Sequence, residues 1–237
     1  MLATSRQVDV GNRILASLPH REFRRILGHL ESVHLSKGEV YIAGDTVCHA
    51  YFPVNGLFSL RSTTEAGSTV EVAMVGNEGL VGVLPMINRK GIIPYDVCVQ
   101  IAADAYRIKI DILREEFDRG ERLQKLMLGY MALLIAQIAQ LSMCHRFHTL
   151  EQTLGRWLLV ARDRVNSDTL NLTQENISNA IGVSRTGVTM AACSLQRAGL
   201  IRYSRGKIVI LDGARLEASA CECYRKIRDE VAQFPRE

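Results

Sequence analysis

Hydrophobic positions recur at different intervals in the two halves of the chain, and this change predicts its organisation. Residues 9–32 show helical spacing, with a second short helix expected to start at Pro19. From 33 to 108 the apolar positions instead form short runs of strand length separated by glycines. The predicted strands are VYIA, AYFPV, LFSLRST, STVEVAMV and YDVCVQIAA. Short strands at this spacing are typical of a small β sandwich or closed roll, which we expect no useful length of helix to interrupt.

The second half has helical periodicity. A short helix is expected over 111–118, a long one over about 120–147 and another over 149–165, which carries the only tryptophan, Trp157. In the long helix, apolar residues alternate at spacings of four and three, the heptad pattern of a coiled coil. These residues are Met127, Met131, Leu134, Ile138 and Leu141. We expect this stripe to pair with a second copy of the chain in a homodimer; a core helix in a monomer is the alternative.

The long helix also needs a comparison with a membrane span. Leu126 to Cys144 is a 19-residue stretch without charge, close to the length that crosses a bilayer. However, Gln137, Gln140 and Ser142 interrupt it, and neither an aromatic belt nor a second span accompanies it. We therefore predict a helix that is buried on two sides in a soluble protein.

Composition narrows the class of protein. With 237 residues, 47% hydrophobic and 23% charged, the chain is long enough for one or two globular domains. The net charge is −1 over residues 1–120 and +5 over 121–237, so a polyanion-binding surface is expected in the second half. The cysteines are Cys48, Cys98, Cys144, Cys193, Cys221 and Cys223. Their scattered positions favour a reducing compartment, and the N-terminus lacks a signal-peptide pattern, so we expect a cytoplasmic protein.

The segment from Leu172 to Asp212 carries the strongest functional signal. Thr173 is a good N-cap for a short helix over 174–181, which Gly182 would end. Ser184 is a second N-cap, for a helix over 185–198. Two short helices joined by such a turn form a helix-turn-helix, whose second helix lies in the DNA major groove. IRYS-RG-KIVIL then predicts a β-hairpin, the wing of a winged helix.

The side chains of this segment suit DNA recognition. Residues 146–210 carry a net charge of +5, which favours phosphate binding. Arg185 begins the second helix, where a guanidinium can contact guanine, and a threonine methyl there can contact thymine. Helix N-termini and hydroxyls would hold phosphates, and Gly187 would let the helix sit deep in the groove. The candidate DNA-binding residues are Thr173, Gln174, Ser184, Arg185, Thr186, Gly187, Thr189, Met190, Arg205 and Lys207.

The order of β-roll, long helix and winged helix-turn-helix resembles the Crp/Fnr family of bacterial transcription regulators, over nearly the whole chain. The matching positions are Gly38-Glu39-Val40-Tyr41, Gly44-Asp45, Tyr51-Phe52-Pro53-Val54, Gly56, Leu60, Gly182-Val183-Ser184-Arg185 and Gly199-Leu200-Ile201. The resemblance implies an α+β protein with a sensor roll (1–119), a dimerisation helix (120–147) and a DNA-binding domain (148–237). It also implies a cytoplasmic homodimer that binds a pseudo-palindromic promoter site, contacts RNA polymerase and is not an enzyme.

The effector is not implied by the resemblance. Members that bind cyclic nucleotides have Gly-Glu-Leu and Arg-Ser or Arg-Thr in the roll, where this chain has Gly82-Val83-Leu84 and Ile93-Pro94. The charged anchors for ribose and cyclic phosphate are therefore missing, and we expect no binding of cyclic AMP in that manner. An iron–sulfur cluster of the oxygen-sensing branch is not expected either, because no cysteine precedes Cys48. The candidate effector-pocket residues are Gly82, Val83, Leu84, Pro94, Tyr95 and Ser142.

Several other side chains can bind metals in principle. His145 and His148 share a helix face at a spacing that suits a metal or haem iron, although packing at a hinge is the favoured interpretation. Cys221 and Cys223 are expected within one amphipathic helix over 213–234, where their side chains would diverge. Cys193 is expected on the inner side of the second helix of the helix-turn-helix. We therefore predict no metal site. A cupin-type enzyme is disfavoured because the roll lacks an HxH motif, and a channel or kinase regulatory domain would lack the winged helix.

Overall fold

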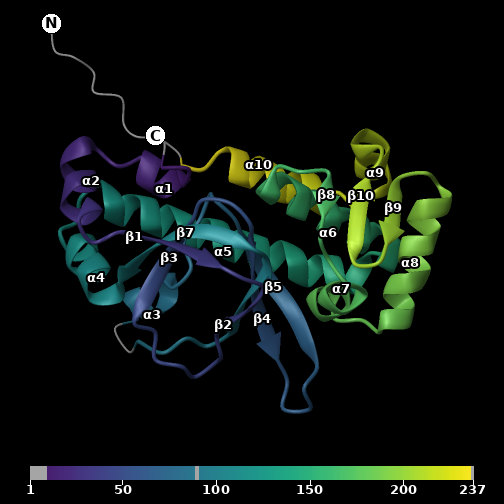
Figure 1. Ribbon diagram of the computed structural model, residues 1–237, viewed down its shortest axis with the longest axis horizontal. Helices are drawn as coiled ribbons and strands as arrows, with labels where there is room; N and C mark the ends of the chain where they lie inside the picture. The colour runs from purple at the N-terminus through teal and green to yellow at the C-terminus, as the bar shows by residue number, and fades with distance from the viewer. Residues whose placement is uncertain (1–9, 89–90, 236–237) are drawn as a thin grey trace, which may run out of the picture.

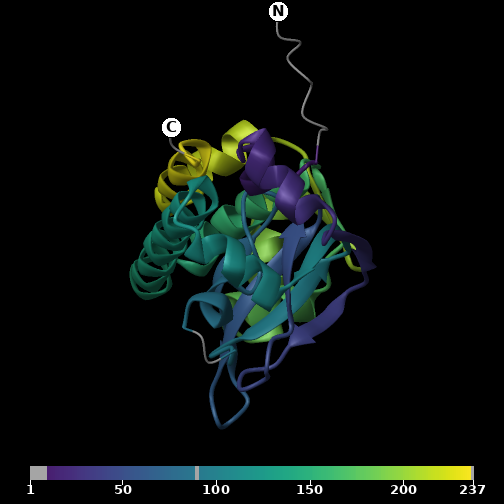
Figure 2. The ribbon, with the colours of Figure 1, turned by 90° about the vertical axis from the view of Figure 1, so that its left-hand side faces the viewer.

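The N-terminal half of the chain is a β-roll preceded by two short helices. The computed structural model describes residues 10–88 and 91–235. One sheet has the strand order β1-β7-β3 and the other β2-β6-β4-β5, with antiparallel pairing throughout (Figures 1 and 2). The elements are α1 (Arg13–Ala16), α2 (His20–Leu27), β1 (Glu31–Leu35), β2 (Gly38–Tyr41), β3 (His49–Pro53), β4 (Leu57–Thr63), β5 (Thr69–Val75), α3 (Val83–Ile87), β6 (Asp96–Ile101), β7 (Ala103–Lys109) and α4 (Ile110–Asp118).

The roll confirms the expected fold class, with differences in detail. The predicted apolar runs correspond to β2 to β6, and the predicted helix over 111–118 corresponds to α4. β1 was not predicted, because its residues are mostly exposed and give no clean alternation. β7 was merged with β6, since only Ala102 separates the two strands. The expectation that no helix interrupts the roll was wrong, because α3 follows the left-handed residue Gly82 (φ 97°).

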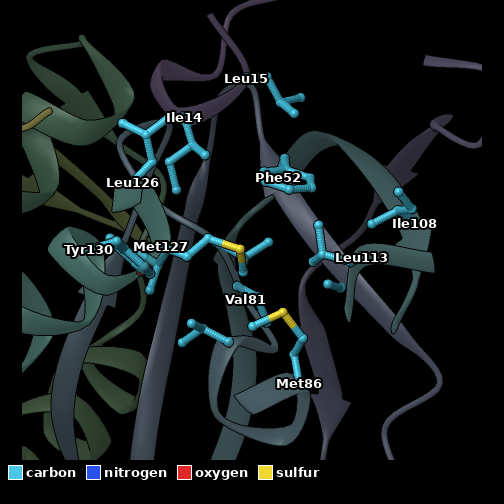
Figure 3. Close-up of a cluster of buried hydrophobic side chains, with 14 of the residues drawn as sticks. Ile14, Leu15, Phe52, Val81, Met86, Ile108, Leu113, Leu126, Met127 and Tyr130 are labelled. Carbon is cyan, nitrogen blue, oxygen red and sulfur yellow. The ribbon is translucent and has the colours of Figure 1, made fainter. Parts of the chain in front are cut away.

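The long helix α5 (Arg122–Phe147) is the centre of the molecule. Its first backbone amides receive a cap from another element: the Glu22 carboxylate of α2 accepts hydrogen bonds from Arg122 N (3.2 Å) and Leu123 N (2.9 Å). A negative charge at this end of a helix also interacts favourably with the helix dipole. Farther along, Met127 and Tyr130 enter the core of the roll (Figure 3). The N-terminal half of α5 is therefore part of the roll.

The predicted dimer stripe on α5 was wrong for three of its five residues, whereas Met131 is half-buried and Ile138 is exposed. Met127, Leu134 and Leu141 are buried within their own chain, where they contact the roll core or the core of the C-terminal domain. The large apolar side chains that α5 exposes are Leu128 (49% exposed), Ile135 (63%), Ile138 (40%) and, at the end of the helix, Phe147 (73%). Of the first three, only Ile138 belongs to the predicted stripe. We call Leu128, Ile135 and Ile138, with the exposed alanines Ala132 and Ala139, the exposed stripe. Leu128 and Ile135 follow the buried Met127 and Leu134 by one position each, and Ile138 is common to the predicted stripe and the exposed stripe.

By length and hydropathy alone, α5 resembles a membrane span. One such helix is weak evidence, since core helices of soluble proteins share these properties. In this chain α5 packs against β5, α4 and α10 as well as the roll core. The structure thus agrees with the prediction of a helix that is covered on more than one side by protein.

The C-terminal half holds the winged helix-turn-helix and a return segment that runs back along α5 (Figure 1). Its elements are α6 (Leu150–Val165), β8 (Thr169–Leu170), α7 (Gln174–Ile181), α8 (Arg185–Arg197), β9 (Ile201–Ser204), β10 (Lys207–Ile210), α9 (Gly213–Ser219) and α10 (Cys223–Ala232). The single helix expected over 213–234 was wrong. The chain becomes extended at Ala220, so that α9 and α10 are separate helices.

Buried polar contacts join the two halves. Arg164 Nε of α6 donates to Glu78 Oε1 of the roll at 3.0 Å, and both side chains are almost fully buried. Trp157 Nε1 donates to Glu71 Oε1 at 2.9 Å, and burial raises the pKa of Glu71 to about 7. Gln137 of α5 pairs with the backbone amide and carbonyl of one β5 residue. A buried polar group is costly without its partner, so these contacts restrict how the halves can dock.

The Glu78–Arg164 pair gives a first prediction. Glu78→Ala leaves the Arg164 guanidinium buried without its counter-charge, so we expect a loss of about 3–5 kcal/mol in the free energy of unfolding. Urea denaturation of the purified protein measures it.

The control is Asp168→Ala, which breaks the exposed Arg162–Asp168 pair (2.6 Å) in the same part of the chain. An exposed pair contributes at most about 1 kcal/mol. Equal losses for the two variants would show that the buried pair does not hold the halves together.

Candidate nucleic-acid interface

Local capping builds the helix-turn-helix as the sequence predicts. Thr173 caps α7: its hydroxyl accepts from Asn176 N (3.1 Å), and Asn176 Oδ1 accepts from Thr173 N (3.0 Å). Such reciprocal bonds are a capping box. Gly182 ends α7 with φ at 75°, in the left-handed region that favours glycine. Ser184 Oγ then accepts from Gly187 N (3.2 Å) and starts α8.

The helix α8 has one buried face and one exposed face. Its buried residues are Val188, Ala191, Ala192 and Leu195. Arg185, Thr186 and Met190 are exposed, and Met190 is 67% exposed although it is apolar. Cys193 is also exposed, so its predicted place on the inner side was wrong. The exposed face is the one available to a major groove.

Two candidate DNA-binding residues of α8, Gly187 and Thr189, make contacts within the protein itself. A Cβ on Gly187 would lie 3.2 Å from Leu150 Cδ2 of α6, so the absence of a side chain at Gly187 allows α8 to pack closely against α6. This packing against α6 is enough to explain a glycine at position 187, whether or not α8 lies deep in the DNA groove. Thr189 is half-buried, and its hydroxyl donates to Arg185 O at 2.9 Å. Its methyl group is the part that remains for a base contact.

The wing is the predicted hairpin. β9 and β10 pair through Lys207 with Ser204 and onward to Ile210 with Ile201, and β8 adds to the other side of β10. Arg205 (φ 42°) and Gly206 (φ 77°) form the turn with positive φ at both positions, as a two-residue hairpin turn requires. A Cβ on Gly206 would lie 3.6 Å from Thr173 Cγ2. The wing turn thus approaches the start of α7.

The surface formed by α7, α8 and the wing is cationic. Arg185, Arg197, Arg202, Arg205 and Lys207 are all exposed. Arg185 pairs with Glu175 of α7 at 2.5 Å, but both side chains are mostly exposed. An exposed ion pair is weak, so Arg185 can exchange Glu175 for a nucleic-acid acceptor at small cost. Figure 1 shows α7, α8 and the wing together at one end of the molecule.

The candidate effector residues are spread over several environments. Gly82 and Val83 are buried at the start of α3, and Val83 belongs to the roll core. Leu84 and Tyr95 are half-buried and Pro94 is exposed. Ser142 is exposed on α5, and its hydroxyl donates within the helix to Ile138 O at 3.0 Å. Burial raises the pKa of Tyr95 to about 12, so its hydroxyl stays protonated at neutral pH.

Comparison with known families and structures defines the class of the protein. Residues 152–219 match the Crp-like helix-turn-helix domain. A putative Crp/Fnr transcriptional regulator from Eubacterium rectale ATCC 33656 is similar in structure: TM-score 0.69, 20% identity, covering 88% of this chain and 98% of that one. FixK2 from Bradyrhizobium japonicum gives a TM-score of 0.67 at 13% identity, covering 81% and 98%. No curated protein matches the sequence.

A transcriptional regulator of the CRP family from Thermus thermophilus is also similar, with a TM-score of 0.64 at 20% identity, covering 79% of this chain and 96% of that one. The fold of this chain is therefore one that is also found in solved transcription regulators. More particularly, the chain carries a Crp-like helix-turn-helix DNA-binding domain on a Crp/Fnr-type fold, with the N-terminal β-roll and long helix of that fold. The suspected resemblance is confirmed at this level.

A pair of substitutions separates base reading from general attraction. Arg185→Ala should cost about 1–3 kcal/mol for each recognition helix bound and relax the preference at one base pair, because a guanidinium there contacts a base edge. Lys207→Ala should weaken binding to all sequences alike and reduce the salt slope by about one per subunit, as loss of a phosphate contact does.

Binding to a panel of single-base operator variants at several salt concentrations measures both effects. An unchanged preference in Arg185→Ala together with an altered one in Lys207→Ala would show that the roles of α8 and the wing are reversed.

Proposed function

We propose that this protein is a homodimeric, sequence-specific transcription regulator that binds a pseudo-palindromic promoter site and is controlled by an effector through the β-roll. The observation that carries the proposal is the exposed stripe of α5, which lies on the helix joining the roll to the DNA-binding domain. Leu128, Ile135 and Ile138 form an apolar exposed face on a helix whose other side is buried in the chain's own cores. A second copy of the same helix offers a matching surface with heptad spacing.

Dimerisation determines the form of the DNA site. A two-fold axis along the paired α5 helices presents two copies of α8, which suit half-sites about 34–36 Å apart, one helical turn of DNA. We therefore expect an inverted repeat. Selection of bound DNA from a random library identifies it directly. Enrichment of an inverted repeat with this spacing supports the proposal, and enrichment of single, unrepeated sites or of no sequence overturns it.

The roll supplies the place for control. Its core extends into α5 through Met127 and Tyr130, so a ligand that changes the packing of the roll also acts on the helix that carries the DNA-binding domain. We propose that the candidate residues around α3 line the effector pocket; the effector itself is unidentified. Contact with RNA polymerase and a cytoplasmic location follow from the resemblance to Crp/Fnr regulators.

The exposed stripe predicts the effect of one substitution on the oligomeric state. Ile135→Glu places a carboxylate from each chain in an apolar interface without a counter-charge, so monomers should replace dimers. DNA affinity should fall as well, because a monomer binds only one half-site. Analytical ultracentrifugation at micromolar protein concentration measures the first effect. Ile135 is mostly exposed in the chain itself, so the variant should still fold.

Met190→Glu is the matched control, since Met190 is a similarly exposed apolar residue on α8 and should leave the oligomeric state unchanged. By contrast, Leu134→Glu would disrupt the chain's own core. A dimer that persists in Ile135→Glu would mean that another surface joins the subunits.

A second prediction concerns cyclic AMP. Val83 and Ile93 stand where cyclic-nucleotide-binding members have charged anchors, so millimolar cyclic AMP should neither raise the melting temperature nor change DNA affinity. A ligand at 100 times its Kd would stabilise the protein by about 2.7 kcal/mol, which a thermal scan detects readily. A clear shift would show that other groups in the roll hold the cyclic phosphate.

A further inference from the structure

Three cysteines and a histidine meet where α5 ends. Cys144 lies in the last turn of α5, and His148 is the residue directly after that helix. Cys221 lies between α9 and α10, and Cys223 is the first residue of α10; both come more than 70 positions later in the chain. Their four ligand atoms all lie within 4.8 Å of one another. We call these four residues the Cys/His cluster.

The break between α9 and α10 creates the cluster. In a continuous helix, Cys221 and Cys223 would point in nearly opposite directions, as the sequence analysis assumed. Because the backbone is extended at Ala220, both thiols instead face the end of α5, where α10 packs beside it. All three cysteines are buried and His148 is half-buried. His145 is exposed and outside the cluster, so of the two histidines considered as metal ligands only His148 lies beside the cysteines.

The distances fit four ligands of one ion. Zn–S bonds of about 2.3 Å in a tetrahedron place the ligand atoms roughly 3.8 Å apart. Cys144 Sγ and Cys221 Sγ are 3.5 Å apart, as are Cys223 Sγ and His148 Nδ1. A disulfide has its sulfurs about 2.05 Å apart, so the three thiols are free.

Neighbouring groups orient the ligands. The Glu222 carboxylate lies 3.2 Å from His148 Nε2, which places the ring proton on Nε2 and leaves the Nδ1 lone pair directed at the cluster. A carboxylate on the far nitrogen of a metal-bound histidine is a common feature of zinc sites. Gln140 Nε2 donates to Cys223 Sγ at 3.0 Å, a hydrogen bond that stabilises a thiolate.

A buried cation balances the charge of the cluster. Arg156 is only 1% exposed, and its Nε has no hydrogen-bond partner among the described residues. The positive charge of Arg156 acts on the Cys144 thiol and favours its thiolate form. Thiolates are the form that binds metals, and three of them with a divalent ion carry one net negative charge.

We propose that the Cys/His cluster is a structural zinc site, in which Cys144, His148, Cys221 and Cys223 bind one Zn²⁺ per chain. Thiolate and imidazole ligands select a thiophilic ion of this kind, and four protein ligands leave no open position for catalysis. The bound ion fastens the return segment to the end of α5. It also holds His148 beside Thr149, which begins the connection to α6, so the site fixes how the DNA-binding domain leaves the long helix.

Metal analysis of the intact protein tests the proposal. Protein purified with a reducing agent and added Zn²⁺, then dialysed into metal-free buffer, should retain one zinc per chain by mass spectrometry. Replacement by Co²⁺ should give the visible absorption of tetrahedral, thiolate-bound cobalt. Cys223→Ser should abolish stoichiometric binding, while Cys48→Ser and Cys98→Ser, an exposed and a buried cysteine outside the cluster, should leave it intact.

Glu222→Gln keeps the test valid if Cys223→Ser fails to fold, because the Glu222 side chain is about half exposed. It should lower the affinity for Zn²⁺ by about 10- to 100-fold in competition with a chelator, with the cobalt spectrum retained. Absence of bound zinc at saturation, a cobalt spectrum insensitive to Cys223→Ser, or a Cys144–Cys221 disulfide in place of metal binding would overturn the proposal.

Discussion

The structure depends on the burial of α5. A 26-residue helix with almost no charge along most of its length must be covered, and each part of the chain contributes to this cover. The roll packs on its N-terminal half, and α10 lies along another side. The exposed stripe is what remains after the chain has covered all it can. An apolar face of this length exposed on a soluble protein is a strong indication of an interface.

Because every part packs on the same helix, the parts are mechanically joined. Met127 belongs to the roll core, Gln137 pairs with the backbone of β5, and Leu141 belongs to the core of the C-terminal domain. The Glu78–Arg164 and Glu71–Trp157 contacts add directional constraints that apolar packing does not provide. The roll and the DNA-binding domain are thus connected both along α5 and directly through β5.

The helix-turn-helix could be predicted closely from sequence because its signals are local. Thr173, Gly182 and Ser184 set the ends of α7 and α8 by short-range hydrogen bonds and backbone preference. The dimer face could not be predicted in this way. Residues 127, 134 and 141 and residues 128, 135 and 142 follow the same heptad spacing, and only the three-dimensional packing decides which set the chain buries for itself.

The Cys/His cluster was missed for a related reason. Ala220 and Glu222 both suit a helix interior, so nothing local predicts the break that brings Cys221 and Cys223 together. The break becomes intelligible once the partners from α5 are considered, since a continuous helix would keep the two thiols apart. The exposed stripe and the Cys/His cluster both bear on how two DNA-binding domains are placed relative to each other. In the proposed dimer, the stripe would set the axis about which two copies pair, and the proposed zinc site would set the angle at which each DNA-binding domain leaves that axis. The separation of two α8 helices on DNA would then depend on both.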